Sequence, residues 1–186
     1  MSGTAAHLVE RVFPEVPVRQ WVLSVPFELR LLLARNPSAL SAVGRLFVER
    51  VLRWQRDSAA RFGIRGAHGG AGSFPQRFGG SLNLNVHYHV AIPDGVFTFT
   101  GDAAPATFHP LPAPGRTDLQ DIASDVAIRT LAWLRRRDLL RDELDETDST
   151  EQRDRSALSA CLEGSFPPPS KLLSSVSVRP FLGPNC

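Results

Sequence analysis

The chain has 186 residues, of which 42% are hydrophobic and 22% charged, a balance typical of a globular protein with one buried core. A formal net charge of +2 excludes a polycation, and two distant cysteines, Cys161 and Cys186, exclude a CxxC zinc ribbon and give no sign of a disulfide framework. Because no apolar run is long enough to span a membrane or to form the core of a secretory signal, we expect a cytoplasmic protein with no membrane partner.

The first half of the chain predicts a strand followed by two helices. Residues 19–25 favour a strand that a proline closes, and the Leu-rich residues 27–35 favour a short helix. Asn36 is a good helix cap and Pro37 suits a first helical position. Apolar residues then recur at spacings of three and four, which predicts an amphipathic helix over residues 37–62.

Arginine supplies every basic side chain except Lys171, and five arginines occupy the polar faces of this second helix. Since guanidinium matches phosphate with paired donors, the stripe is expected either to lie along a phosphate backbone or to be a solvated face paired with Glu49 and Asp57. A GC-rich coding bias also explains the abundance of arginine. The five residues are Arg45, Arg50, Arg53, Arg56 and Arg61.

The centre of the chain predicts a hairpin. Residues 63–73 are rich in glycine but lack the GxxxxGK[ST] pattern of a nucleotide phosphate loop. Residues 74–78 favour a strand, and a Gly-Gly-Ser turn connects it to a second strand over residues 82–92. Strict alternation in this second strand predicts one face on a core and one polar face, which carries Asn83, Asn85, His87 and His89.

Later residues predict one more strand and one more helix. Residues 96–100 are expected to join the same sheet, and residues 101–116 to form a loop rich in Pro and Ala. Thr117 and Gln120 fit a capping box at the start of an amphipathic helix over residues 117–140.

These elements predict three regions. Residues 1–18 form a lead-in, residues 19–142 form one α+β domain, and residues 143–186 form a poorly structured tail without periodicity. In the domain the sheet is expected to be mostly antiparallel, with both long helices packed on one of its faces.

Two histidines two residues apart on one strand face can share a metal ion, and several motifs surround this pair. The motifs are VRQWVLS at 18–24, QRFGG at 76–80, LNLNVHYH at 82–89, PDGVF at 93–97 and FHP at 108–110. Together they resemble the bacterial insertion-sequence transposases of the two-tyrosine HUH type, named for His, a hydrophobic residue and His. The resemblance covers residues 7–142.

The resemblance implies a palm like that of replication initiators, with helices on one face of an antiparallel sheet. It implies a divalent metal, Mg²⁺ or Mn²⁺, held by His87 and His89, which would polarise the scissile phosphate of single-stranded DNA. DNA contacts are expected from Arg53, Arg56, Arg77, Asn83 and Asn85.

The third ligand is an open question at this level. Gln76 is the candidate by motif position. Phe74 and Phe78 are two residues to either side of it and would share its face of a regular strand, so Gln76 would lie on the core face unless a bulge intervenes. Asn85 and Asp94 are the alternatives.

The chain departs from this family in two places. It has no cysteine-rich zinc domain. Its single tyrosine, Tyr88, lies between the two histidines in the sequence, and the alternation of the strand is expected to point it to the apolar face, away from the metal. We therefore expect a truncated transposase without a nucleophilic tyrosine, missing the zinc-binding and tyrosine-bearing segments and inactive alone.

Two other functions fit the same residues. One is a remnant that binds single-stranded DNA without metal chemistry. The other is a cupin-like metalloenzyme, because Asp94 follows the His87-x-His89 pair by five residues. The two long predicted helices argue against the all-β barrel that a cupin requires.

Overall fold

The computed structural model describes residues 15–78, 83–101, 105–140 and 176–180. It is an α+β fold, as expected from the sequence, and within the described residues it is not an all-β barrel. No described helix is long and apolar enough to cross a membrane. The elements in chain order are β1 (Val18–Ser24), α2 (Phe27–Arg35), α3 (Pro37–Arg61), β2 (Gly72–Phe78), β3 (Leu84–Pro93), β4 (Gly95–Thr98), β5 (Thr107–Pro110), α4 (Arg116–Arg135) and β6 (Val176–Pro180).

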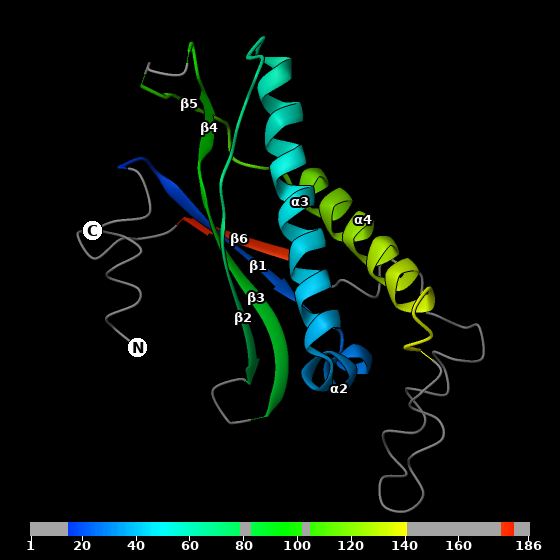
Figure 1. Cartoon of the computed structure of the whole chain (residues 1–186). Coiled ribbons are helices and arrows are strands. Elements are labelled where there is room, and N and C mark those ends of the chain that lie inside the picture. The colour runs from blue at the N-terminus through cyan, green and yellow to red at the C-terminus, as the bar shows by residue number, and fades with distance from the viewer. Residues whose placement is uncertain (1–14, 79–82, 102–104, 141–175, 181–186) are drawn as a thin grey trace, which may run out of the picture.

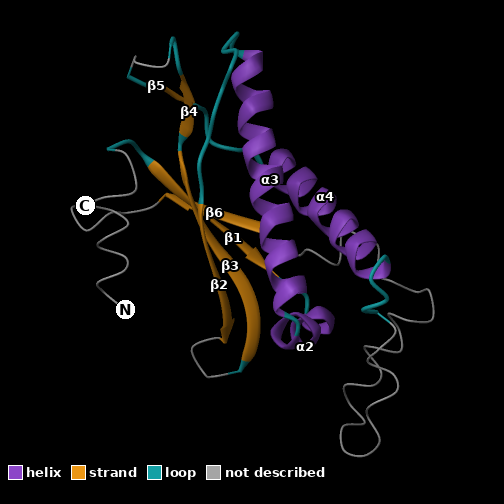
Figure 2. Ribbon diagram, in the orientation of Figure 1, coloured by secondary structure: helices purple, strands orange, loops and turns teal. Residues whose placement is uncertain are grey.

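The main sheet has four strands in the order β2-β3-β1-β6, and all of its neighbours are antiparallel. Figure 1 shows α3 and α4 side by side on one face of this sheet, with α2 at one end. The prediction that both long helices pack on a single face is therefore confirmed. The secondary structure in Figure 2 shows the same two layers, one of helices and one of strands.

The hydrophobic core lies between these two layers. Trp21 from β1 packs edge-on against Trp54 from α3, with 5.6 Å between ring centroids. Phe47 of α3 and Val86 of β3 are fully buried in the same cluster. Asn36 accepts a hydrogen bond from the Ala39 N–H at 3.0 Å, so the predicted cap of the long helix is confirmed.

Residues 96–100 do not extend the main sheet, and that prediction is wrong. β4 pairs instead with β5 in a separate two-stranded ribbon. β5 lies inside residues 101–116, which were expected to form a loop. The physical reason is the length of the neighbouring strands. β1 begins at Val18, which lies opposite Pro93, and β2 begins at Gly72, which lies opposite Ala91. Among the described residues, no strand of the main sheet continues alongside the chain beyond Pro93.

The start of the last helix also differs from the prediction. α4 begins at Arg116 rather than Thr117, and Gly115 is the capping residue. The Gly115 N–H donates to Oδ2 of Asp118 at 2.8 Å, so Asp118 takes the role that had been assigned to Gln120. The helix ends at Arg135 instead of residue 140.

The region expected to be a poorly structured tail contains one described strand. β6 pairs antiparallel with β1, where Trp21 lies opposite Val178. The sequence analysis did not predict this strand. The other residues of the tail from 143 onward, and residues 1–14 of the lead-in, lie outside the described part of the chain.

Candidate metal and DNA site

The alternation of β3 separates two kinds of side chain. Val86, Tyr88 and Val90 are buried toward the helices, whereas His87 and His89 are half-buried on the opposite face of the sheet. The two imidazole centroids are 4.9 Å apart and the rings are inclined by 74°. The predicted histidine pair is therefore together on one face, at a separation that suits two ligands of one ion.

The neighbouring strands bring further side chains to this face. Gln76 of β2 lies directly opposite His87, and Phe74 lies directly opposite His89. Directly opposed residues share a face of the sheet, with about 5 Å between their Cβ atoms. Gln76 is thus beside His87 and away from the core face, which the sequence allowed only if a bulge interrupts β2.

The reason is an irregularity in the pairing of β2 with β3. The register shifts between Gln76 and Phe78, so Phe78 lies opposite Leu84, which packs against the core. Phe74 and Gln76 precede the shift and share the face of the histidines, while Phe78 does not.

Hydrogen bonds hold both imidazoles by their Nδ1 atoms. Nδ1 of His87 donates to the carbonyl oxygen of Asn85 at 2.7 Å, which leaves the lone pair on Nε2. The Gln20 amide Nε2–H donates to Nδ1 of His89 at 2.8 Å, so Nδ1 accepts and a neutral His89 ring carries its proton on Nε2. With the Gln20 amide turned over, its oxygen would accept from Nδ1–H and Nε2 of His89 would carry a free lone pair. The Nδ1 bond of His87 is the arrangement by which proteins orient histidine ligands of metals.

Electrostatics favours the neutral form of His89. Burial lowers the pKa of His89 below its usual 6.5, and the neighbouring His87 lowers it further. A neutral imidazole is the form that binds a metal, so the site is set for ligation at neutral pH.

The donor set fits a divalent ion only in part. It comprises two imidazoles and the Gln76 carboxamide, and the described residues contain no group of three or more His, Cys, Asp or Glu side chains that could hold a metal. Mg²⁺ prefers six oxygen ligands, whereas Mn²⁺ accepts imidazole more readily. These residues therefore fit a weakly held Mn²⁺ better than Mg²⁺.

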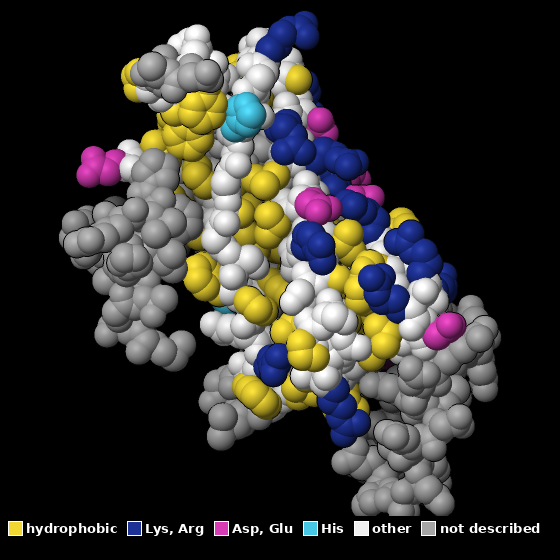
Figure 3. Space-filling model, viewed as in Figure 1, with side chains coloured by type: hydrophobic (Ala, Val, Ile, Leu, Met, Phe, Trp, Pro, Cys, Tyr) yellow, Lys and Arg dark blue, Asp and Glu magenta, His cyan; other side chains and the backbone are white. Residues whose placement is uncertain are grey.

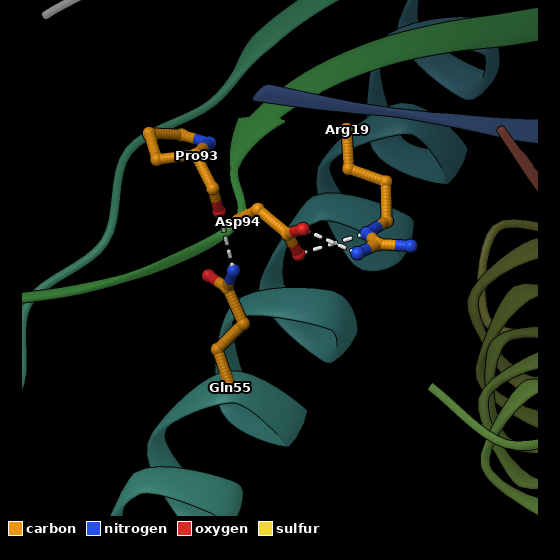
Figure 4. A network of polar contacts seen from close by, with 4 residues as sticks. All are labelled: Arg19, Gln55, Pro93 and Asp94. Carbon is orange, nitrogen blue, oxygen red and sulfur yellow. Dashed lines mark hydrogen bonds and ion pairs between the residues drawn. The ribbon is translucent and has the colours of Figure 1, made fainter. Parts of the chain in front are cut away.

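Asp94 is engaged elsewhere. Its carboxylate accepts from Nε of Arg19 at 2.8 Å and also pairs with Nη2 of the same guanidinium. Next to it, Gln55 donates to the Pro93 carbonyl oxygen at 2.7 Å, as Figure 4 shows. This network secures the end of β3 against β1 and α3, and it leaves Asp94 a poor candidate for the third ligand.

The residues expected to contact DNA fall on different sides of the molecule. Arg53 and Arg56 are exposed on α3, in the layer opposite the histidine face. Figure 3 shows basic side chains along the surface of the helices. Arg77 of β2 and Asn83, immediately before β3, are exposed near the end of the hairpin that carries the histidines.

Acidic partners neutralise other arginines of the helical layer. Arg50 of α3 pairs with Asp125 of α4 at 3.3 Å, and Arg129 pairs with Glu49 at 3.4 Å. The expected pairing of the stripe with Glu49 is therefore wrong: Arg50 pairs with an acid of α4, and Glu49 pairs with Arg129, an arginine of α4.

Tyr88 is directed away from the histidines. It is 1% exposed, and its hydroxyl donates to the Leu40 carbonyl oxygen at 2.8 Å. Burial raises the pKa of this phenol, which disfavours the phenolate. The single tyrosine of the sequence thus holds α3 against β3 and cannot reach a phosphate at the histidine face.

Gln20 of β1 is a site residue that was not predicted from the sequence. The signal was present, because Gln20, Val22 and Ser24 alternate with the buried residues of β1. The pairing of β1 with β3 places Ser24 opposite His87 and Val22 opposite His89. This register cannot be read from the sequence of β1 alone.

Comparison with known proteins identifies the family. A family model described as "Putative transposase" matches residues 70–164, slightly more than half of the chain. The match includes β2 and β3, and therefore Gln76 and both histidines. Neither the curated proteins nor the solved structures gave a match. On the strength of the family match, this chain belongs to the transposase family.

Proposed function

We propose that this transposase-family chain is an HUH-type domain that binds single-stranded DNA on the histidine face of its sheet. His87 and His89 would hold a divalent metal, Mn²⁺ in preference to Mg²⁺, and Gln76 would be the third protein donor. The observation that carries this proposal is the pair of imidazoles 4.9 Å apart, each held by a hydrogen bond at Nδ1.

A bound metal would supply a Lewis acid that polarises a phosphate and fixes its position. The chain's own residues have simpler roles. Asn85 and Gln20 orient the two imidazoles through their Nδ1 atoms. Arg77 and Asn83, exposed beside the hairpin, are available to phosphate oxygens of the strand. Arg53 and Arg56 would meet a different part of the DNA, since they lie in the helical layer.

A second function is favoured by one observation, the burial of Tyr88. Strand transfer in this mode needs a nucleophile in line with the phosphate, and the only tyrosine is on the core side of β3. A domain that binds single-stranded DNA without cutting it is therefore the alternative.

Metal titration tests the proposal directly. Calorimetry with Mn²⁺ should give weak binding to the wild-type chain, and His87→Ala/His89→Ala should abolish it. The affinity should fall as the pH drops below 6.5, because the pKa of His89 is lowered from that value and its protonation removes a ligand.

His109→Ala is the matched control, because His109 lies in the β4–β5 ribbon and bonds to Thr98 instead. It should titrate like the wild type. Equal heats for wild type and the double variant would remove the metal from the proposed function.

A further inference from the structure

The β4–β5 ribbon has two different faces. On one face Val96 is fully buried in a small cluster with Ala59 at the end of α3 and Leu111 after β5, and Ile64 and Ala67 pack around them. This inner face attaches the ribbon to the helical layer. Its side chains have an ordinary structural role.

The outer face of the ribbon carries four rings. Phe97 lies opposite Phe108, with 5.1 Å between ring centroids. His68 joins Phe97 through two backbone hydrogen bonds of 2.8 Å, and its ring meets Phe99 at 5.4 Å. We call these four residues the aromatic face. Figure 3 shows hydrophobic side chains gathered beside a histidine at this end of the molecule.

Two of these rings have no role in the core. Phe99 is 58% exposed and His68 is also exposed. Exposed aromatic side chains gathered in one place are typical of a binding surface. Phe97 and Phe108, by contrast, are half-buried, and the Phe108 ring packs over the backbone of Gly95.

The aromatic face continues the histidine face along one run of chain. Only Asp94 separates β3 from β4. Val90 and Ile92 of β3 point into the core, and Val96 of β4 again points inward, toward α3. Phe97 is therefore at an odd-numbered position like His87 and His89, on the side away from these buried residues. Phe97 follows His89 by eight positions, which in extended chain is a length of about 26 Å.

The described residues around the aromatic face carry no negative charge, and Asp102, between β4 and β5, lies outside the described part of the chain. The described residues of the ribbon and of the preceding loop, 63–71, 95–101 and 105–111, contain no Asp or Glu and include Arg65. The adjoining Asp94 is neutralised by Arg19. No carboxylate of these segments would repel a DNA backbone.

We propose that the aromatic face stacks unpaired nucleobases of the DNA strand whose phosphate lies at the histidine pair. This inference rests on the proposed function, which supplies the single strand. Aromatic rings stack on bases of any sequence, so the face would hold the strand without selecting a sequence. The metal site would engage the backbone, and the ribbon would engage the bases on one side of it.

Fluorescence anisotropy with two labelled probes tests this proposal. The first is an oligothymidine, and the second is an abasic oligomer of equal length with the same phosphates and no bases. The double variant Phe99→Ala/His68→Ala should weaken binding of oligothymidine by about 5- to 100-fold. It should leave binding of the abasic oligomer unchanged.

Phe27→Ala is the matched control. Phe27 is 58% exposed, the same fraction as Phe99, but it lies on α2 at the other end of the molecule. This variant should bind both oligomers like the wild type. Phe99→Leu is a second variant, because it keeps apolar bulk without an aromatic ring, and it should also weaken binding of oligothymidine.

The possible failures are distinguishable. If the ribbon variants bind oligothymidine like the wild type while His87→Ala/His89→Ala loses Mn²⁺, the stacking face is wrong and the metal site stands. If they lose both oligomers equally, the rings do not recognise bases and the inference is overturned. If the wild-type chain binds neither oligomer, the proposed function is wrong and this inference falls with it.

Discussion

Gln20 decides which nitrogen of His89 is free. Its amide Nε2–H donates to Nδ1 at 2.8 Å, which places the proton of a neutral His89 ring on Nε2, and only the amide turned over would let Nδ1 donate instead. Only the donating form leaves Nε2 with a lone pair directed away from Gln20. A residue that contacts no metal therefore controls whether His89 can be a ligand.

At this scale we expect Gln20→Glu to raise the pKa of His89. The wild-type pKa is lowered by burial and by His87, and a carboxylate beside Nδ1 would favour the imidazolium. Histidine ring signals followed by NMR from pH 5 to 8, without metal, measure this shift. Gln20→Leu should leave His89 in a mixture of tautomers, and an unchanged His89 titration in both variants would contradict the role of Gln20.

The lowered pKa also has a consequence for stability. Between the folded-state pKa of His89 and the unfolded value of 6.5, the unfolded chain binds more protons than the folded chain. The contribution of His89 to the free energy of unfolding therefore falls as pH drops through this window, and it is constant above it.

The β4–β5 ribbon depends on one close approach between its strands. A Cβ atom at Gly95 would lie 2.7 Å from Cζ of Phe108 and would also collide with the carbonyl oxygen of His109. Glycine is needed here because the His109 carbonyl oxygen and the Phe108 ring leave no room for a Cβ atom, not because of an unusual backbone angle.

Gly95→Ala should therefore lower the free energy of unfolding by about 1–3 kcal/mol, the usual cost of overpacking. Urea denaturation followed by tryptophan fluorescence measures the loss. Gly70→Ala is the control, because a Cβ there meets no atom within 4 Å. Equal midpoints for the two variants would show that the strands of the ribbon can separate at no cost.

On the scale of the whole molecule, the sheet separates two chemically different surfaces. One side carries the helices with their arginines and the buried Tyr88, and the other carries the histidines and Gln76. A phosphate at the histidine pair would be on the wrong side of the sheet for the tyrosine hydroxyl, which bonds to Leu40.

We therefore expect this chain to form no covalent link with DNA through its tyrosine. An end-labelled single strand incubated with protein and Mn²⁺, then boiled in SDS and run on a denaturing gel, should give no labelled protein band. Tyr88→Phe is the control, since it keeps the packed ring. A band that survives boiling for the wild type and is absent for Tyr88→Phe would refute the expectation.

Local features of the fold were predictable from the sequence. The alternation in residues 82–92 was sufficient to identify β3 and to place His87 beside His89, because side chains two apart on a strand always share a face. Asn36 and Pro37 were sufficient to locate the start of α3, because a helix cap involves only neighbouring residues.

Long-range pairing was decided only by the tertiary structure. Gln76 faces the histidines because of a register shift near Phe78, and Gln20 meets His89 across 69 positions of sequence. β5 pairs with β4 and β6 with β1; the short alternation of Val176 and Val178 with polar residues does not say which strand β6 joins. A strand's partner and register depend on the packing of the whole sheet, which the order of residues within one strand does not contain.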